Sequence, residues 1–82
     1  MKTRIKNLRE DHDYTQVQIS ELLKVSQVAY SYYEIEKRNI PLDILVKLAN
    51  FYNTSIDYIL YRTDNPMPYS PSKTQKNNYP PV

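Results

Sequence analysis

The sequence predicts an all-α fold, with five short helices in residues 1–61 and a proline-rich C-terminal tail in residues 62–82. Apolar residues in the first segment recur every three or four positions, which is the period of an amphipathic helix. Ser, Thr or Pro stands at each expected helix start, where these residues are favoured. Five of the six prolines lie in the tail, which is therefore expected to be extended or disordered unless it docks on a partner.

The first helix is predicted over Thr3–Asp11, with Ile5 and Leu8 as its apolar stripe. The chain contains no glycine, the residue that most readily ends a helix in the left-handed conformation. His12 or Asp13 is therefore expected to take that conformation at the end of this helix.

Two further helices are predicted to be joined by a tight turn at Lys24 and Val25. Thr15 is the expected N-cap of the first of them, and Gln18 completes a capping-box pattern. The residues expected to face inward on this helix are Ile19, Leu22 and Leu23. Ser26 caps the next helix, which is predicted over residues 28–35. Such a pair is a helix-turn-helix, whose second helix is built to lie in the major groove of DNA.

A fourth and a fifth helix follow a polar loop over residues 36–40. Pro41 suits the first turn of the fourth helix, and Asn53 suits its left-handed end. The expected apolar face of this helix consists of Leu42, Leu45, Val46, Leu48, Ala49 and Tyr52. Thr54 or Ser55 caps the short fifth helix.

Composition excludes several classes of function. With no Cys and a single histidine, His12, the chain has no disulfide framework and no cluster of His or Cys metal ligands; His12 is expected to lie at a solvated helix end. No apolar run approaches the roughly 18–20 residues of a membrane span, so we expect a soluble, cytoplasmic protein without a membrane partner. No nucleophile–base pair or phosphate loop is evident. We therefore expect neither an enzyme nor a cofactor or small-molecule ligand.

The charge balance does not by itself predict a nucleic-acid partner. The formal net charge is +2, and residues 1–60 carry eight basic and eight acidic side chains. Any electrostatic attraction to DNA must therefore depend on where the charges lie.

Six short stretches carry a resemblance to a known family. They are Arg-Ile-Lys-Asn-Leu-Arg in the first helix, Tyr-Thr-Gln before the second, Leu-Lys-Val-Ser at the turn, Ser-Tyr-Tyr-Glu at the end of the third, Lys-Arg-Asn-Ile-Pro in the loop and Ser-Ile-Asp-Tyr-Ile-Leu at the fifth. Residues 4–64 thereby resemble the DNA-binding domain of phage-repressor-type regulators, the Cro-like or xenobiotic-response-element-like (XRE) family. The resemblance implies a five-helix, lambda-repressor-like domain that binds double-stranded operator DNA.

The start of the third helix is expected to read bases. Gln can pair with adenine through two hydrogen bonds, and Val can pack on the thymine methyl group. The expected base contacts are Gln27, Val28, Ser31 and Tyr32. The alternative is that these residues form the solvent face of a surface helix.

A second set of residues is expected to hold the DNA backbone. The N-terminus of the second helix suits a phosphate oxygen, and in the family the residue that matches Gln16 clamps the backbone. The expected phosphate contacts are Thr15, Gln16, Ser26, Lys37, Arg38 and Asn39. The alternatives are an ordinary exposed Gln in a capping box and a solvated run of charges in the loop.

The resemblance also implies structural roles. Arg9 and Glu34 match positions that form a partly buried ion pair in the family. Tyr30 and Tyr33 are expected in the core, with their hydroxyls at its periphery. Lys24 stands where the family favours glycine, so a left-handed Lys24 is expected, at a cost on the order of 1 kcal/mol.

The leading prediction is a sequence-specific DNA-binding transcriptional regulator, a repressor, that binds a near-palindromic operator as a homodimer. The candidate dimer surface consists of Ile56, Ile59, Leu60 and Tyr61, unless these residues only close the core. The alternative function is a protein-interaction module, such as an antitoxin or adaptor, that uses the C-terminal tail.

Overall fold

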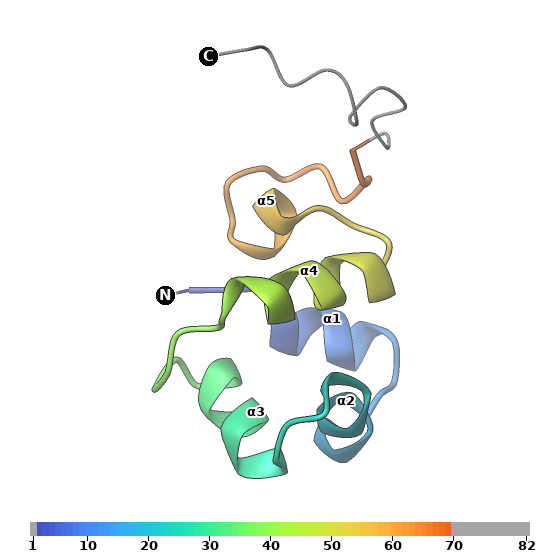
Figure 1. Cartoon of the computed structure of the whole chain (residues 1–82). Coiled ribbons are helices and arrows are strands. Elements are labelled where there is room, and N and C mark those ends of the chain that lie inside the picture. The colour runs from blue at the N-terminus through green and yellow to red at the C-terminus, as the bar shows by residue number, and fades with distance from the viewer. Residues whose placement is uncertain (1, 70–82) are drawn as a thin grey trace, which may run out of the picture.

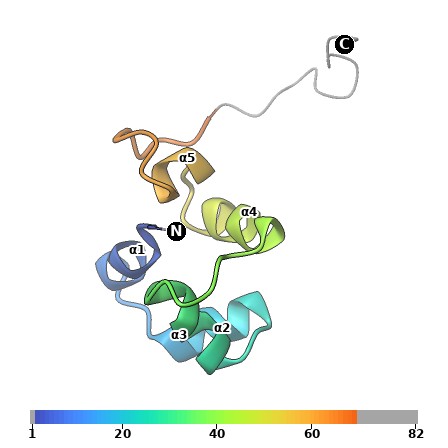
Figure 2. The same ribbon diagram turned by 90° about the vertical axis from the view of Figure 1, so that its left-hand side faces the viewer.

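The structure, a computed structural model, describes residues 2–69 and has five α-helices and no strand within that range. The helices are α1 (Ile5–Asp11), α2 (Gln16–Leu23), α3 (Gln27–Glu34), α4 (Leu42–Phe51) and α5 (Ile56–Ile59). In Figures 1 and 2, α2 and α3 form one end of the molecule and α5 the other, with α1 and α4 between them. The all-α prediction is confirmed. Residues 70–82, most of the predicted tail, lie outside the described residues.

One apolar core joins all five helices. Ile5 of α1, Ile19 and Leu23 of α2, Leu48 of α4 and Ile59 of α5 are each at most 2% exposed. Tyr30 and Tyr33 of α3 are also buried, at 0% and 6%, which confirms their predicted place in the core. However, the Tyr30 hydroxyl is itself buried and has no hydrogen-bond partner among the described residues, so the expectation of a peripheral hydroxyl is wrong.

Several apolar residues lie on the opposite side from the one expected. Leu42 and Val46 of α4 are 69% and 42% exposed, and Leu22 of α2 is 43% exposed. The apolar stripe of α4 that faces the core instead consists of Ile44, Leu45, Leu48 and Ala49. Ile40, expected in a polar loop, is 6% exposed and packs in the core.

Three helix starts are capped by hydroxyl side chains. The side-chain oxygens of Thr15, Ser26 and Ser55 each accept a hydrogen bond from the backbone N–H three residues later. The Thr15 N–H in turn donates to Gln18 Oε1 at 2.8 Å, which completes the predicted capping box. At α5 the cap is Ser55 rather than Thr54.

Each helix is followed by a residue in the left-handed conformation that glycine usually provides. These residues are Asp13, Lys24, Glu36, Asn53 and Tyr61, with φ between 53° and 65°. The residue that follows each of them donates its N–H to the carbonyl five positions before itself. This hydrogen bond satisfies a free carbonyl at the helix end. The predictions for Lys24 and Asn53 are confirmed, and Asp13, not His12, ends α1. Glu36 and Tyr61 are additional positions of this kind.

Arg4 fastens the start of α1 to the end of α5. Its Nε donates to the Tyr58 carbonyl at 2.7 Å, and its Nη2 lies 3.0 Å from Asp64 Oδ1. The guanidinium also lies 4.2 Å and 4.1 Å from the ring centroids of Tyr58 and Tyr61.

Ile59, one of the four candidate dimer residues, is fully buried in the monomer core. The expectation that Ile59 contributes to a dimer surface is therefore wrong.

Residues 62–69, which the sequence assigns to the tail, turn back towards α4 and α5. Thr54 Oγ1 donates to the Pro66 carbonyl, and the Tyr69 hydroxyl donates to Asp57 Oδ2, both at 2.6 Å. Pro68 and Tyr69 also line an open groove of about 330 Å³ together with residues of α4 and α5. The described part of this segment is therefore attached to the helical domain by specific contacts.

Candidate nucleic-acid interface

The turn between α2 and α3 sets the angle of the helix pair. Ser20 of α2 is 4% exposed, and its hydroxyl donates to the Val17 carbonyl at 2.8 Å. Lys24 turns the chain with φ 58° and ψ 41°, and the Val25 N–H returns to the Ser20 carbonyl at 3.0 Å. The small side chain and the left-handed turn together bring α3 against α2.

The first turn of α3 is open to solvent. Gln27 is exposed, and Val28 is 61% exposed despite its apolar side chain. Ser31 and Tyr32, one turn later, are half-buried. Among the four expected base contacts, Gln27 and Val28 are therefore the two most accessible to a DNA base.

The two cap hydroxyls near this helix pair keep a proton to donate. Thr15 Oγ1 and Ser26 Oγ each accept a backbone hydrogen bond, and a hydroxyl that accepts a bond can still donate its own hydrogen. Both caps remain exposed. Each cap can therefore hold its helix and contact a phosphate oxygen at the same time.

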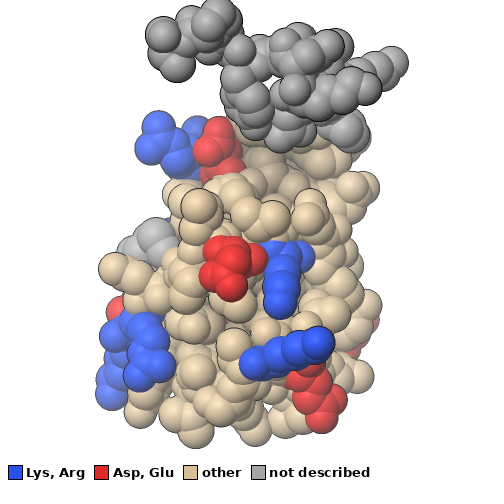
Figure 3. All heavy atoms as spheres, viewed as in Figure 1, with Lys and Arg blue, Asp and Glu red and all other residues tan. Residues whose placement is uncertain are grey.

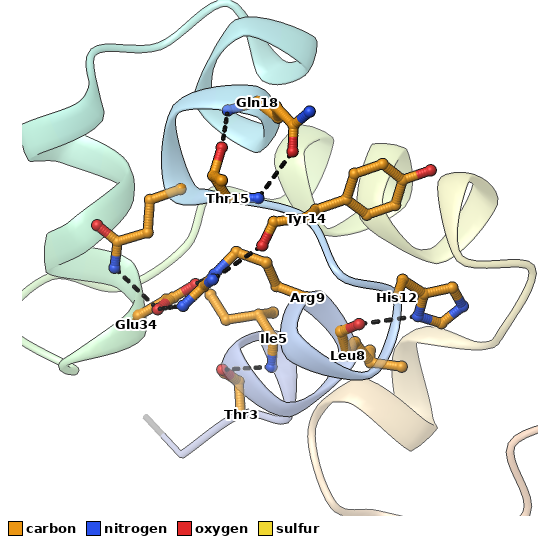
Figure 4. A network of polar contacts seen from close by, with 10 residues as sticks. Thr3, Ile5, Leu8, Arg9, His12, Tyr14, Thr15, Gln18 and Glu34 are labelled. Carbon is orange, nitrogen blue, oxygen red and sulfur yellow. Dashed lines mark hydrogen bonds and ion pairs between the residues drawn. The ribbon is translucent and has the colours of Figure 1, made fainter.

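Gln16 is held by a polar network that crosses from α1 to α3. Arg9 Nε lies 2.7 Å from Glu34 Oε2, and Arg9 Nη1 donates to the Tyr14 carbonyl at 3.0 Å. Figure 4 shows Arg9 reaching from α1 to both partners. The Gln16 amide donates to Glu34 Oε1 at 3.0 Å. The ion pair therefore also fixes the direction of the Gln16 side chain, which has a second N–H available.

Burial and hydrogen bonding set the protonation of the ion pair and of two nearby tyrosines. Burial alone would raise the pKa of Glu34, whose side chain is 1% exposed, but hydrogen bonds from Arg9 and Gln16 more than offset this and lower the pKa. The pKa of Arg9 is raised by its hydrogen bond to Glu34. Burial raises the pKa of Tyr30, and raises that of Tyr52 to about 12. At neutral pH the pair is ionised and the two tyrosines are neutral.

The loop after α3 carries exposed positive charge. Lys37, Arg38 and Asn39 are all exposed, and Figure 3 shows basic side chains gathered at the edge where this loop lies in Figure 1. The loop directly follows Glu34, the residue that contacts Gln16. The sequence-predicted phosphate contacts of α2 and of the loop thus lie at the same end of α3.

Two contacts in this region were not predicted from the sequence. Gln16 and Glu34 are 18 positions apart, and nothing in the capping pattern around Gln16 indicates its partner. The Tyr32 ring lies 5.6 Å from Lys37 Nζ and 5.4 Å from Arg38 Cζ. The spacing of an aromatic residue five and six positions before two cations is the one signal that could have suggested this second contact.

Within residues 2–69, no group of three or more His, Cys, Asp or Glu side chains is placed to hold a metal ion. In the same part of the chain, no helix is long and apolar enough to cross a membrane.

Comparison with known proteins gives consistent matches. A family model described as helix-turn-helix matches residues 5–59. The uncharacterized HTH-type transcriptional regulator YobD of Bacillus subtilis (strain 168) is 41% identical over 73 residues, which are 89% of this chain and 65% of YobD. The HTH-type transcriptional regulator ImmR of the same organism is 40% identical over 57 residues, 70% of this chain and 45% of ImmR. The chain spans less than two thirds of the length of either relative.

Proposed function

Since this chain belongs to the XRE-type helix-turn-helix family, we propose that it is a DNA-binding regulator of transcription that places α3 in the major groove and has no catalytic activity. The observation that carries the proposal is the exposed pair Gln27 and Val28 at the start of α3. An exposed amide beside an exposed apolar side chain on a helix of this motif suits the edge of an A·T base pair.

The proposed contacts divide into two kinds. Gln27, Val28 and Ser31 read bases, and they provide sequence preference. The phosphate contacts are the two cap residues Thr15 and Ser26, together with Gln16, Lys37, Arg38 and Asn39. These contacts set the position of the domain on the duplex without reading sequence. The exposed caps, the oriented Gln16 amide and the basic loop support this division.

A homodimer on a near-palindromic operator is part of the proposal. One domain presents a single short helix to the groove, and two copies bound one helical turn apart would double the base contacts. Repression follows if such a site overlaps a promoter. Both relatives bear the name of transcriptional regulators, which supports a role in transcription for this chain.

The second candidate function is a protein-interaction module, such as an antitoxin or adaptor. The observation that favours it is the equal number of acidic and basic residues in residues 1–60, because DNA-binding domains usually carry excess positive charge. A salt titration separates the two functions. Binding through several phosphate contacts weakens steeply with salt, whereas capture of a partner through apolar contacts does not.

Two substitutions test the division of roles. Gln27→Ala should weaken binding to a selected site and relax base preference at one position, by about 1–3 kcal/mol of discrimination. Gln16→Ala should weaken binding to all sequences alike. Fluorescence anisotropy with the selected site and with single-base variants measures both effects. Unchanged affinity in both variants would show that α3 does not occupy the groove.

A further inference from the structure

Tyr32 contacts the basic loop that follows its own helix. Its ring centroid lies 5.6 Å from Lys37 Nζ and 5.4 Å from Arg38 Cζ, both within the range of about 6 Å in which a cation is attracted to an aromatic ring. Tyr32 is half-buried, whereas both cations are exposed. The half-buried ring is therefore in contact with two charged side chains that extend into solvent.

The backbone of Tyr32 holds the same loop. Its carbonyl accepts hydrogen bonds from the N–H groups of Lys37 and Arg38, at 3.0 Å and 3.4 Å. The left-handed Glu36, with φ 65°, reverses the chain so that these N–H groups meet the end of α3. One residue thus fixes both the backbone of the loop and the direction of its two cations.

The ring and the hydroxyl of Tyr32 would serve different roles. A tyrosine that reads a base edge does so through its hydroxyl, whereas a tyrosine that orients cations does so through its ring. Here the ring is engaged by cations that are themselves expected to contact phosphates. Long basic side chains lose rotamer entropy when they bind. A ring that already restricts Lys37 and Arg38 in the free protein lowers this cost, and it can do so without itself contacting the DNA.

We propose that Tyr32 is a positioning residue that orients Lys37 and Arg38 toward the phosphates of the DNA backbone, rather than a residue that reads bases. The proposal rests on the proposed function of α3. Its central requirement is the aromatic ring, not the hydroxyl. It therefore makes opposite predictions for Tyr32→Phe, which keeps the ring, and Tyr32→Leu, which removes it.

Anisotropy titrations on the selected DNA site test the proposal. Tyr32→Phe should bind within about twofold of the wild type. Tyr32→Leu should bind about five- to thirtyfold more weakly, the equivalent of removing two exposed cation–π interactions. The weakening should be the same on every single-base variant of the site. The slope of log affinity against log salt should also become shallower, by up to about 0.9 for each phosphate that Lys37 or Arg38 no longer neutralises.

A double-mutant cycle distinguishes positioning from a general structural effect. In a K37A/R38A background, adding Tyr32→Leu should change affinity by less than about twofold, because there are no cations left to orient. An NMR measurement on the free protein gives a second readout. Ring-current shifts of the Lys37 and Arg38 side-chain protons should persist in Tyr32→Phe and disappear in Tyr32→Leu.

Three results would overturn the proposal. Tyr32→Phe could lose as much affinity as Tyr32→Leu, which would assign the role to the hydroxyl. Tyr32→Leu could relax preference at a single base pair, which would make Tyr32 a base reader. Its full cost could also persist without the two cations, which would make the effect a fold defect. A wild-type protein that binds no DNA would instead refute the proposed function itself.

Discussion

Replacing Lys24 with glycine should stabilise the domain, because Lys24 ends α2 in a conformation that its Cβ disfavours. Its φ and ψ of 58° and 41° lie in the left-handed region, where a residue with a Cβ is strained by about 1–2 kcal/mol. Lys24 is exposed, and within the described residues its side chain forms no hydrogen bond, ion pair or cation–π contact. The substitution would therefore remove strain and no favourable contact.

The expected gain is smaller than the strain removed. Glycine increases the conformational freedom of the unfolded chain, which costs about 0.4–1 kcal/mol. The free energy of unfolding should therefore rise by about 0.5–1 kcal/mol. In a domain of this size the melting temperature should rise by about 2–8 °C. The N–H groups of Lys24 and Val25 that close the helix end are retained.

Thermal and urea unfolding of matched variants measure this gain. Lys24→Ala loses the charge but keeps the Cβ, so it should give no increase. Asn53→Gly should gain less than Lys24→Gly, because asparagine tolerates the left-handed region better than lysine does. If Lys24→Gly melts no higher than Lys24→Ala, the turn between α2 and α3 is not left-handed in solution.

Three further predictions concern the interactions that hold the domain together. Arg9→Leu should lower the free energy of unfolding by about 3–5 kcal/mol in urea titrations, since it leaves the buried Glu34 carboxylate unpaired. If the double variant Arg9→Leu, Glu34→Leu unfolds as easily as Arg9→Leu, the unpaired carboxylate is not the cause of the loss. The lowered pKa of Glu34 contributes stability above its ordinary pKa of 4.5, and that stability is lost as pH falls through the folded-state pKa. Glu34→Gln should therefore flatten the fall in melting temperature below about pH 4.5. An unchanged melting temperature profile at acid pH would contradict the lowered pKa. Arg4→Leu should cost about 3–5 kcal/mol, from the charge-assisted hydrogen bond to the Tyr58 carbonyl and the two cation–π interactions. Calorimetry showing a decrease below about 0.5 kcal/mol would refute that role.

Three of the helix starts and two of the helix ends were predictable because local chemistry determines them. Thr15, Ser26 and Asn53 act on backbone groups within a few residues of themselves. The same reasoning did not identify Glu36 and Tyr61 as left-handed. Neither residue type favours that conformation, and the hydrogen bonds that close these two helix ends, from Lys37 N–H and Arg62 N–H, are seen only in the structure.

The orientation of the helices could not be predicted from periodicity alone. Apolar residues lie all along α4, so more than one face of this helix is apolar, and the choice of Ile44 over Leu42 for the core depends on the helices packed against it. The contact between Gln16 and Glu34 likewise requires the tertiary structure, because it joins α2 to the end of α3. The residues of the candidate interface are a prediction from the sequence, whereas the contacts among them became visible only in three dimensions.

Selection of bound sequences from a random DNA pool tests the central claim most directly. The account predicts enrichment of one short motif in two inverted copies, with centres about one helical turn apart. Affinity for the selected site should fall steeply with salt. Recovery of no motif, with binding no tighter than to random DNA, would contradict the assignment of α3 to the major groove.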